Sequence, residues 1–407
     1  MAFKNVIGQA EVKQQLIELL SSNRLSHALL FLGQEGSGAL PLALAFAQYV
    51  SLIPDEGGPS TSAASLFGEE SPVATAISLP GNPEEADAWM AKQPAYTRSS
   101  ALQHPDIHFS YPVIPKKTGD KPLSTDYIQE WREFVSQYPY GNAFDWLQFI
   151  GAENKQGNIS AYECTDIIHK LSLKSFESRY KILVMWMPEY LGNEGNKLLK
   201  LIEEPPEDTL FILVAENESL ILPTILSRTQ LVKIPPLITK DIATALAERA
   251  GVEQDQAQRL ASISQGNYRE ALQLLQHAAD DWQGLLREWL NAILKTGPVA
   301  QVKWVEEISK SGRERQKQFL RYFNHLLEYA IRLRVTGELH TNLPEAERDF
   351  AIRLNKISDI AQQQAIIGEL DNAVYYIERN ANAKMLFHAL TIKLYHIIAD
   401  KTTTLVN

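Results

Sequence analysis

Residues 27–50 read HALLFLGQEGSGALPLALAFAQYV, and this stretch decides the fold class. The apolar run His27–Leu32 has the length and composition of a strand that is buried on both faces, as in a parallel sheet. A glycine loop, Gly33–Gly38, comes next, and an Ala- and Leu-rich segment with Pro41 near its start follows it. Proline is well tolerated in the first turn of a helix. The stretch therefore predicts a strand–loop–helix unit of an α/β protein with a parallel sheet.

The loop has the glycine frame of a phosphate-binding loop, G-x-x-x-x-G-K-[ST], without its working residues. Gly33, Gly36 and Gly38 keep the frame, but Ala39 and Leu40 stand where the pattern requires a lysine and a hydroxyl. Alanine cannot reach the β- and γ-phosphates, and leucine cannot offer a hydroxyl to magnesium. Two interpretations stay open at this point: backbone amides that hold an anion, or a tight turn without a ligand.

A second loss concerns the acid that a phosphate-loop ATPase carries at the end of a neighbouring strand. The apolar run Lys181–Met185 predicts that strand, but Trp186, Met187 and Pro188 follow it. The first carboxylate comes only at Glu189. Because the loop and the strand have each lost a required group, we expect that this chain does not hydrolyse ATP and binds no cofactor.

The rest of the chain predicts further strands and then only helices. The apolar runs Leu210–Val214 and Gln230–Ile234 are typical of buried strands. Three short helices are expected between Thr239 and Ala278, and longer amphipathic helices between Trp282 and Lys401. We therefore expect three domains: an α/β domain over 1–236, a small helical lid over 237–279 and an all-α domain over 280–407.

One segment interrupts this pattern. Residues 54–100 are rich in Pro, Ser, Gly and Glu and predict a flexible insert, after which order resumes near His104. The aromatic residues between 127 and 149 recur at helical spacing and predict core packing. His104, Asp106 and His108 have ligand-type side chains but no further local partners, so we expect no metal site.

Composition restricts the class of function. The 407 residues include 39 Lys and Arg against 49 Asp and Glu, and this net charge of −10 argues against a general nucleic-acid coat protein. The single cysteine, Cys164, excludes a disulfide framework and a multi-thiolate zinc site within the chain. The N-terminal residues lack the apolar run of a signal peptide, and no stretch has the length of a membrane span. We expect a soluble cytoplasmic protein.

Several segments together carry a resemblance to a known family. Residues 196–206 read NKLLKLIEEPP, residues 223–229 read PTILSRT, and residues 24–31 read RLSHALLF. They resemble the N-A-L-L-K-x-L-E-E-P-P, T-I-L-S-R-C and R-L-x-H-A-x-L-F segments of the clamp-loader subunits of bacterial DNA polymerase III. The segments at 6–9 and 381–386 also resemble the opening and the last collar helix of that family. The resemblance implies an AAA+ domain, a lid domain and a helical collar.

Within that family, a degenerate loop is typical of a non-catalytic subunit, which stands in a ring with gamma/tau and delta subunits. The ring opens the sliding clamp and places it on primer–template DNA. The resemblance implies that Arg228, with Ser227 of the same motif, reaches across a subunit interface to ATP on the neighbouring gamma/tau as an arginine finger. Thr229 stands where the family has cysteine, and the four-cysteine zinc module of many relatives is missing.

Arg269 matches the position at which active members of the family carry a second phosphate sensor. Without the loop lysine, the alternative role for this arginine is an ion pair within its helix or between the lid and the α/β domain.

Two other functions stay open. An ATPase with a non-standard nucleotide site requires a replacement lysine near the loop, where Glu35 has the wrong charge, and a carboxylate near Met185. A helical scaffold for replication or repair proteins, in which the α/β part is only structural, requires that Arg228 has no effect on the ATPase of a clamp loader.

Overall fold

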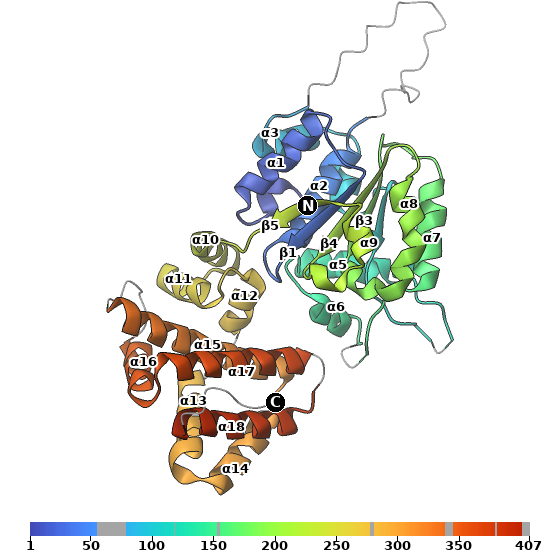
Figure 1. Ribbon diagram of the computed structural model, residues 1–407. Coiled ribbons are helices and arrows are strands. Elements are labelled where there is room, and N and C mark those ends of the chain that lie inside the picture. Colours follow the sequence, from blue (N-terminus) through green and yellow to red (C-terminus); the bar gives the residue numbers. More distant parts are fainter. Residues whose placement is uncertain are drawn as a thin grey trace, which may run out of the picture. The chain divides into compact units, whose positions relative to one another are not determined.

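The computed structural model describes residues 1–54, 79–117, 119–152, 155–276, 281–337, 345–378 and 381–400. The chain divides into two compact units, Met1–Leu272 and Gln273–Asn407. The first unit holds a five-stranded sheet with helices around it, and the second is helical (Figure 1). The α/β class expected for the first part and the helical class expected for the last part are confirmed.

The sheet is parallel throughout, with the strand order β2-β3-β4-β1-β5. The strands are β1 (Ala28–Gly33), β2 (Ile107–Ser110), β3 (Lys181–Trp186), β4 (Thr209–Ala215) and β5 (Gln230–Ile234). In β1, Phe31 lies opposite Val214 of β4 and Val232 of β5. The four strands predicted from apolar runs are confirmed, and their ends shift by one residue or none.

Helices precede, separate and follow the strands. In the first unit they are η1 (Phe3–Asn5), α1 (Ala10–Ser21), α2 (Ala39–Ser51), α3 (Pro83–Met90), α4 (Tyr96–Ser100), η2 (Ser124–Tyr127), α5 (Ile128–Gln137), α6 (Ala143–Phe149), α7 (Ala161–Ser172), η3 (Pro188–Leu198), α8 (Leu199–Glu203), η4 (Glu218–Leu220), α9 (Pro223–Leu226), α10 (Thr239–Ala250) and α11 (Gln254–Ile263). Helix α12 (Tyr268–Gln276) crosses the division. The second unit contains α13 (Trp282–Asn291), η5 (Ala292–Thr296), α14 (Pro298–Ser309), α15 (Arg313–Thr336), α16 (Glu345–Ile357), α17 (Ile360–Glu378) and α18 (Ala383–Ala399).

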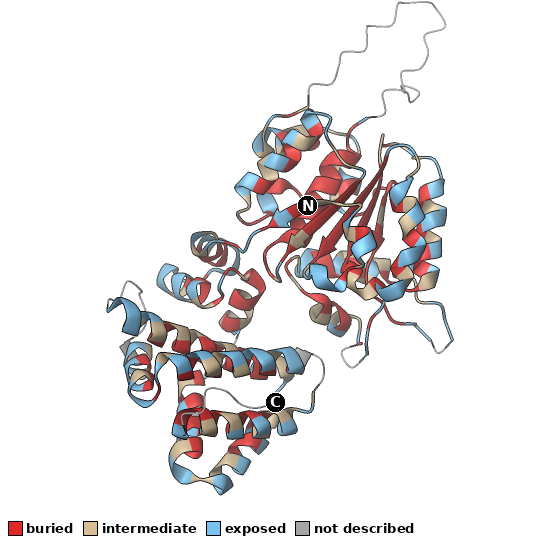
Figure 2. Ribbon diagram, viewed as in Figure 1, coloured by how far each residue is buried: buried red, intermediate tan, exposed pale blue. Residues whose placement is uncertain are grey.

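Alternate residues of the strands enter two different cores. Leu29 and Phe31 of β1 pack into the core that contains α1, α2 and α5, whereas Ala28 and Leu30 pack into the core that contains α7 and α8. Burial on both faces explains why the strands are continuous apolar runs rather than alternating ones. Figure 2 shows the central strands β1, β3 and β4 almost entirely buried, whereas the edge strand β5 has two exposed residues.

The expected lid helices are present as α10, α11 and α12, with the breaks at Gly251 and at 265–267 that the sequence predicts. The division into units falls inside α12 and not at the predicted boundaries 236/237 and 279/280, so α10 and α11 belong to the same compact unit as the sheet. A separate lid domain stays a prediction.

The insert predicted over 54–100 is partly wrong. Residues 55–78 lie outside the described residues, but helices α3 and α4 form between Pro83 and Ser100, well before the expected return of order at His104. Asn82 caps α3 by accepting a hydrogen bond from the Glu85 amide. Pro83 therefore occupies the first helical position, where it favours a helix rather than a loop.

The segment His104-Pro105-Asp106 has a structural role in this unit. The buried Asp106 carboxylate accepts hydrogen bonds from the amides of Phe176, Glu177 and Ser178 at 2.5–2.9 Å. The buried His104 imidazole lies with Nε2 3.2 Å from the Glu177 carboxylate. These two side chains therefore hold the turn that leads into β3, and among the described residues no group of three His, Cys, Asp or Glu side chains could hold a metal ion.

The aromatic residues expected to form a core do so. Trp131 of α5 and Trp146 of α6 are fully buried with ring centroids 5.4 Å apart, while Tyr138 is exposed. In the second unit, Trp289 stacks on Trp304 at 4.6 Å. Within the described part of the chain, no helix is both long and apolar enough to cross a membrane.

Cys164 provides a test of this packing. Its side chain is buried on α7, its thiol lies 3.6 Å from the Glu194 carbonyl oxygen, and burial raises its pKa to about 11. Because the thiolate is the reacting form, we expect the native chain to resist a thiol reagent at pH 8 and the urea-unfolded chain to react fully. Rapid labelling of the native chain, measured by mass spectrometry, would contradict the packing of α7.

Candidate functional site

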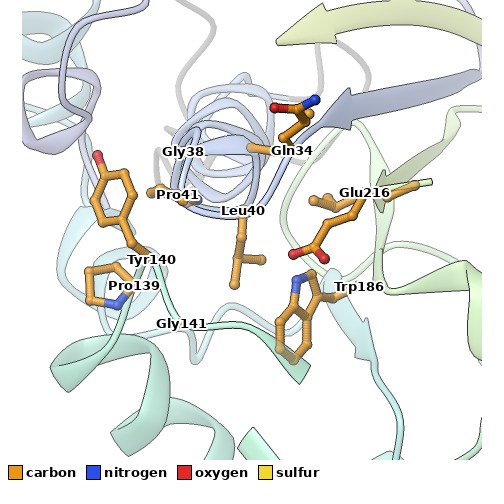
Figure 3. Close-up of a pocket in the computed structure, with 14 residues that line it drawn as sticks. Gln34, Gly38, Leu40, Pro41, Pro139, Tyr140, Gly141, Trp186 and Glu216 are labelled. Atoms are coloured by element: carbon orange, nitrogen blue, oxygen red, sulfur yellow. The ribbon is translucent and has the colours of Figure 1, made fainter. Parts of the chain in front are cut away.

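The glycine loop closes over a very small cavity. The loop joins β1 to α2, and the carboxyl ends of β3 and β4 lie beside it (Figure 3). The cavity has a volume of about 20 Å³, which is room for about one water molecule. Residues from four segments of the chain line it: Gly33, Gln34, Gly36, Gly38, Ala39, Leu40, Pro41, Pro139, Tyr140, Gly141, Trp186, Val214, Ala215 and Glu216.

Apolar side chains take the positions of the missing reactive groups. Ala39 and Leu40 are both buried at the start of α2. Figure 3 shows Leu40 and the Trp186 indole pointing into the same space, with Trp186 coming from the end of β3. At this edge of a parallel sheet a ligand would be expected. The space is instead filled by the chain's own leucine and tryptophan.

Two carboxylates, those of Glu189 and Glu216, lie near this edge of the sheet. Neither directly follows β3, where a phosphate-loop ATPase would carry its acid. The Glu189 carboxylate accepts hydrogen bonds from the amides of Glu216 and Asn217, so it holds the turn after β4; its burial raises its pKa. The Glu216 side chain lines the cavity itself. Sequence reasoning missed Glu216, although its position directly after a predicted strand was the available signal.

The glycines of the loop make room for protein groups. Gly36 has a φ of +71°, and a Cβ at this position would overlap the side-chain amide of Asn267 from the lid segment. A Cβ on Gly33 would approach Ile234 of β5 to 2.8 Å. The glycine frame is therefore required by the packing of this chain, whether or not an anion binds there.

Arg269 at the start of α12 forms an ion-pair cluster with the loop. Its guanidinium donates hydrogen bonds to both oxygens of Asp145, at 2.5 and 2.6 Å, and to Glu35 Oε1 at 3.0 Å. Only 5% of the Arg269 side chain is exposed. The ion pair between the lid segment and the α/β domain is therefore present, while a sensor role for Arg269 stays a prediction.

Arg228 lies in a different place, in the short turn between α9 and β5. The guanidinium donates to the Thr224 carbonyl oxygen at 2.7 Å and to Ser227 Oγ at 3.1 Å, and it pairs with the Glu203 carboxylate. About a third of the side chain, 34%, stays exposed. Five residues line an open recess of about 420 Å³ here: His27, Ile202, Glu203, Ser227 and Arg228.

The structure thus separates the residues predicted from the sequence into two sites. Gly33, Gly36, Gly38, Ala39 and Leu40 belong to the filled cavity, whereas Ser227 and Arg228 belong to the open recess. Sequence reasoning also missed Glu203 as the partner of Arg228, although Glu203 belongs to the LIEEPP segment.

The parallel five-stranded sheet and the glycine loop after β1 define the first unit as an α/β protein with a phosphate-loop-type fold. The family model described as "DNA polymerase III, delta subunit" matches residues 75–238. The delta' subunit of DNA polymerase III from Bacillus subtilis is 26% identical over 266 residues, which cover 65% of this chain and 59% of that protein. The delta' subunit from Escherichia coli is 28% identical over 178 residues, 43% of this chain and 51% of that protein.

These matches confirm the expected resemblance: the chain is similar to delta' subunits of bacterial DNA polymerase III. It spans little more than half the length of these two curated relatives. Among solved structures, a gamma-subunit-related protein of Thermotoga maritima matches with a TM-score of 0.37 and 14% identity, over 94% of this chain and 98% of that chain.

The packing role of Gly36 can be tested against a matched glycine. Gly36→Ala introduces both a strained positive φ and an overlap with Asn267, whereas Gly251→Ala introduces only the strain, because nothing lies within 4 Å of its Cβ. We expect Gly251→Ala to cost about 1 kcal/mol of unfolding free energy and Gly36→Ala to cost about 3 kcal/mol. Urea denaturation measures both, and equal costs would contradict the contact between loop and lid segment.

Proposed function

We propose that this chain is a non-catalytic clamp-loader subunit, which holds gamma/tau and delta and supplies Arg228 to the ATP of a neighbouring subunit. The complex would open the sliding clamp and load it onto primer–template DNA in replication. The observation that carries the proposal is the filled cavity at the glycine loop, in a chain that resembles delta' subunits and keeps an exposed arginine elsewhere.

The filled cavity supports a degenerate nucleotide site. A space of about 20 Å³ holds one water molecule, far less than a nucleotide pocket of several hundred Å³. Ala39 and Leu40 offer neither charge nor hydroxyl, and Trp186 stands where magnesium would need a carboxylate. Because the lysine, the hydroxyl and the carboxylate are all absent from this cavity, no single substitution would restore a nucleotide site.

The surroundings of Arg228 support a role in trans. A guanidinium is charged at every physiological pH and can bind two phosphate oxygens at once. Its pair with Glu203 is partly exposed, and an exposed pair contributes only about 0–1 kcal/mol. A nucleotide phosphate on a neighbouring subunit can therefore replace Glu203 at little cost. The Thr224 carbonyl and Ser227 hydroxyl would keep the side chain oriented toward the open recess.

Reconstitution with gamma/tau and delta tests the finger. We expect Arg228→Ala to leave assembly intact and to lower clamp- and DNA-stimulated ATP hydrolysis by at least about tenfold, because a trans arginine contributes strongly to phosphoryl transfer. Arg179→Ala is the matched control, since Arg179 is also a partly exposed arginine of this unit that pairs with a carboxylate, Asp208. Unchanged hydrolysis with Arg228→Ala would reject the finger and favour the helical scaffold.

The nucleotide site can be tested in the isolated chain. We expect neither the unaltered chain nor the double variant Ala39→Lys, Leu40→Thr to bind a fluorescent ATP analogue with magnesium, because Trp186 still fills the cavity. Fluorescence anisotropy measures the binding. Saturable binding by the unaltered chain would instead support an ATPase with a non-standard site.

A further inference from the structure

Three segments that are distant in sequence meet at one guanidinium. Arg269 comes from the lid helix α12, Glu35 from the glycine loop, and Asp145 from the first turn of α6. The distances are 3.0 Å to Glu35 Oε1 and 2.5 Å to Asp145 Oδ2. The exposed fractions of the three side chains are 5%, 17% and 22% in the same order, so the cluster is largely shielded from water.

Neutral groups extend this cluster on both sides. The side-chain amide of Asn142 donates to Glu35 Oε2 at 2.9 Å, and that of Asn267 donates to Glu35 Oε1 at 3.2 Å. The amide of Tyr268 donates to the Gly36 carbonyl oxygen at 3.2 Å. The Tyr268 ring also packs edge-on against Tyr140 with centroids 5.0 Å apart. Loop, α6 and lid helix are therefore joined by side chains and by backbone.

The charges of the cluster explain what holds the lid segment. In an active phosphate-loop protein, bound phosphates supply the negative charge that a lid arginine contacts, so closure depends on the ligand. Here two carboxylates of the chain itself supply that charge, and Asp145 binds the guanidinium with both oxygens. Because these carboxylates are covalently part of the protein, their contact with the guanidinium does not require a bound ligand.

We propose that Glu35, Arg269 and Asp145 form a latch that keeps α12 closed on the glycine loop without nucleotide. This proposal rests on the proposed function, in which the nucleotide site is degenerate, and it adds the device that replaces nucleotide. The latch gives the first unit one lid position throughout the ATP cycle of its neighbours. Gly36 is part of the device, because its missing Cβ admits Asn267 beside Glu35.

Hydrogen exchange of the full chain, followed by mass spectrometry, tests the latch. We expect Arg269→Met to speed exchange in peptides over 264–272 by at least about tenfold, because removing one partner of a buried ion pair leaves charges uncompensated. Arg259→Met is the control, since Arg259 is an exposed arginine of the neighbouring helix α11. ATP with magnesium is expected to leave exchange of the unaltered chain unchanged.

A second variant separates a latch from general damage to the fold. Glu35→Gln keeps the size of the side chain and removes its charge, and we expect an intermediate increase of exchange confined to the same peptides. The double variant Glu35→Gln, Arg269→Met should exchange no faster than Arg269→Met, because the partners act together. Additive effects, or no effect of Arg269→Met, would overturn the latch. Protection by ATP would overturn it too, while the Arg228 experiment tests the proposed function separately.

Discussion

Strand β1 must be buried on both faces, and the first unit is organised by that constraint. It lies between β4 and β5, so its backbone groups pair on both edges, and its side chains enter two separate cores. A strand in this position requires helices on both sides of the sheet and a tight turn at its carboxyl end. The glycine loop is that turn, and packing alone requires glycine at positions 33 and 36.

At the same loop, side chains of the protein occupy the space and supply the charges. The volume that a ligand would need is filled by Leu40 and Trp186, and the charge it would bring is provided by Glu35 and Asp145. Burying Arg269 is tolerable because the carboxylates of Asp145 and Glu35 accept its hydrogen bonds. The side-chain amides of Asn142 and Asn267 donate to Glu35 in turn. Arg228 meets the opposite condition, since about a third of its side chain is exposed and its pair with Glu203 is partly solvated.

Sequence patterns predicted much of the fold and part of the site. The strands follow from apolar runs, and the lid helices follow from periodicity with breaks at Gly251 and 265–267. The composition of segment 54–100 hides helices α3 and α4, because its Pro, Ser, Gly and Glu content predicts an insert, although Asn82 before Pro83 is a good N-cap. The roles of Glu203 and Glu216 do not follow from the sequence, because membership of a motif or a position after a strand does not show which arginine or cavity a side chain faces.

By itself, the sequence determined the class of fold, the loss of the lysine, hydroxyl and acid, and the resemblance to delta' subunits. Each of these depends on residue type and on local spacing, which periodicity and motifs record directly. Only the tertiary structure decided that Arg269 contacts Asp145 and Glu35, which are 124 and 234 residues away. These contacts form because the order of the strands and the path of the chain after β5 bring α12 beside the glycine loop and α6. Opposite charges then attract each other once the fold places them within a few ångströms.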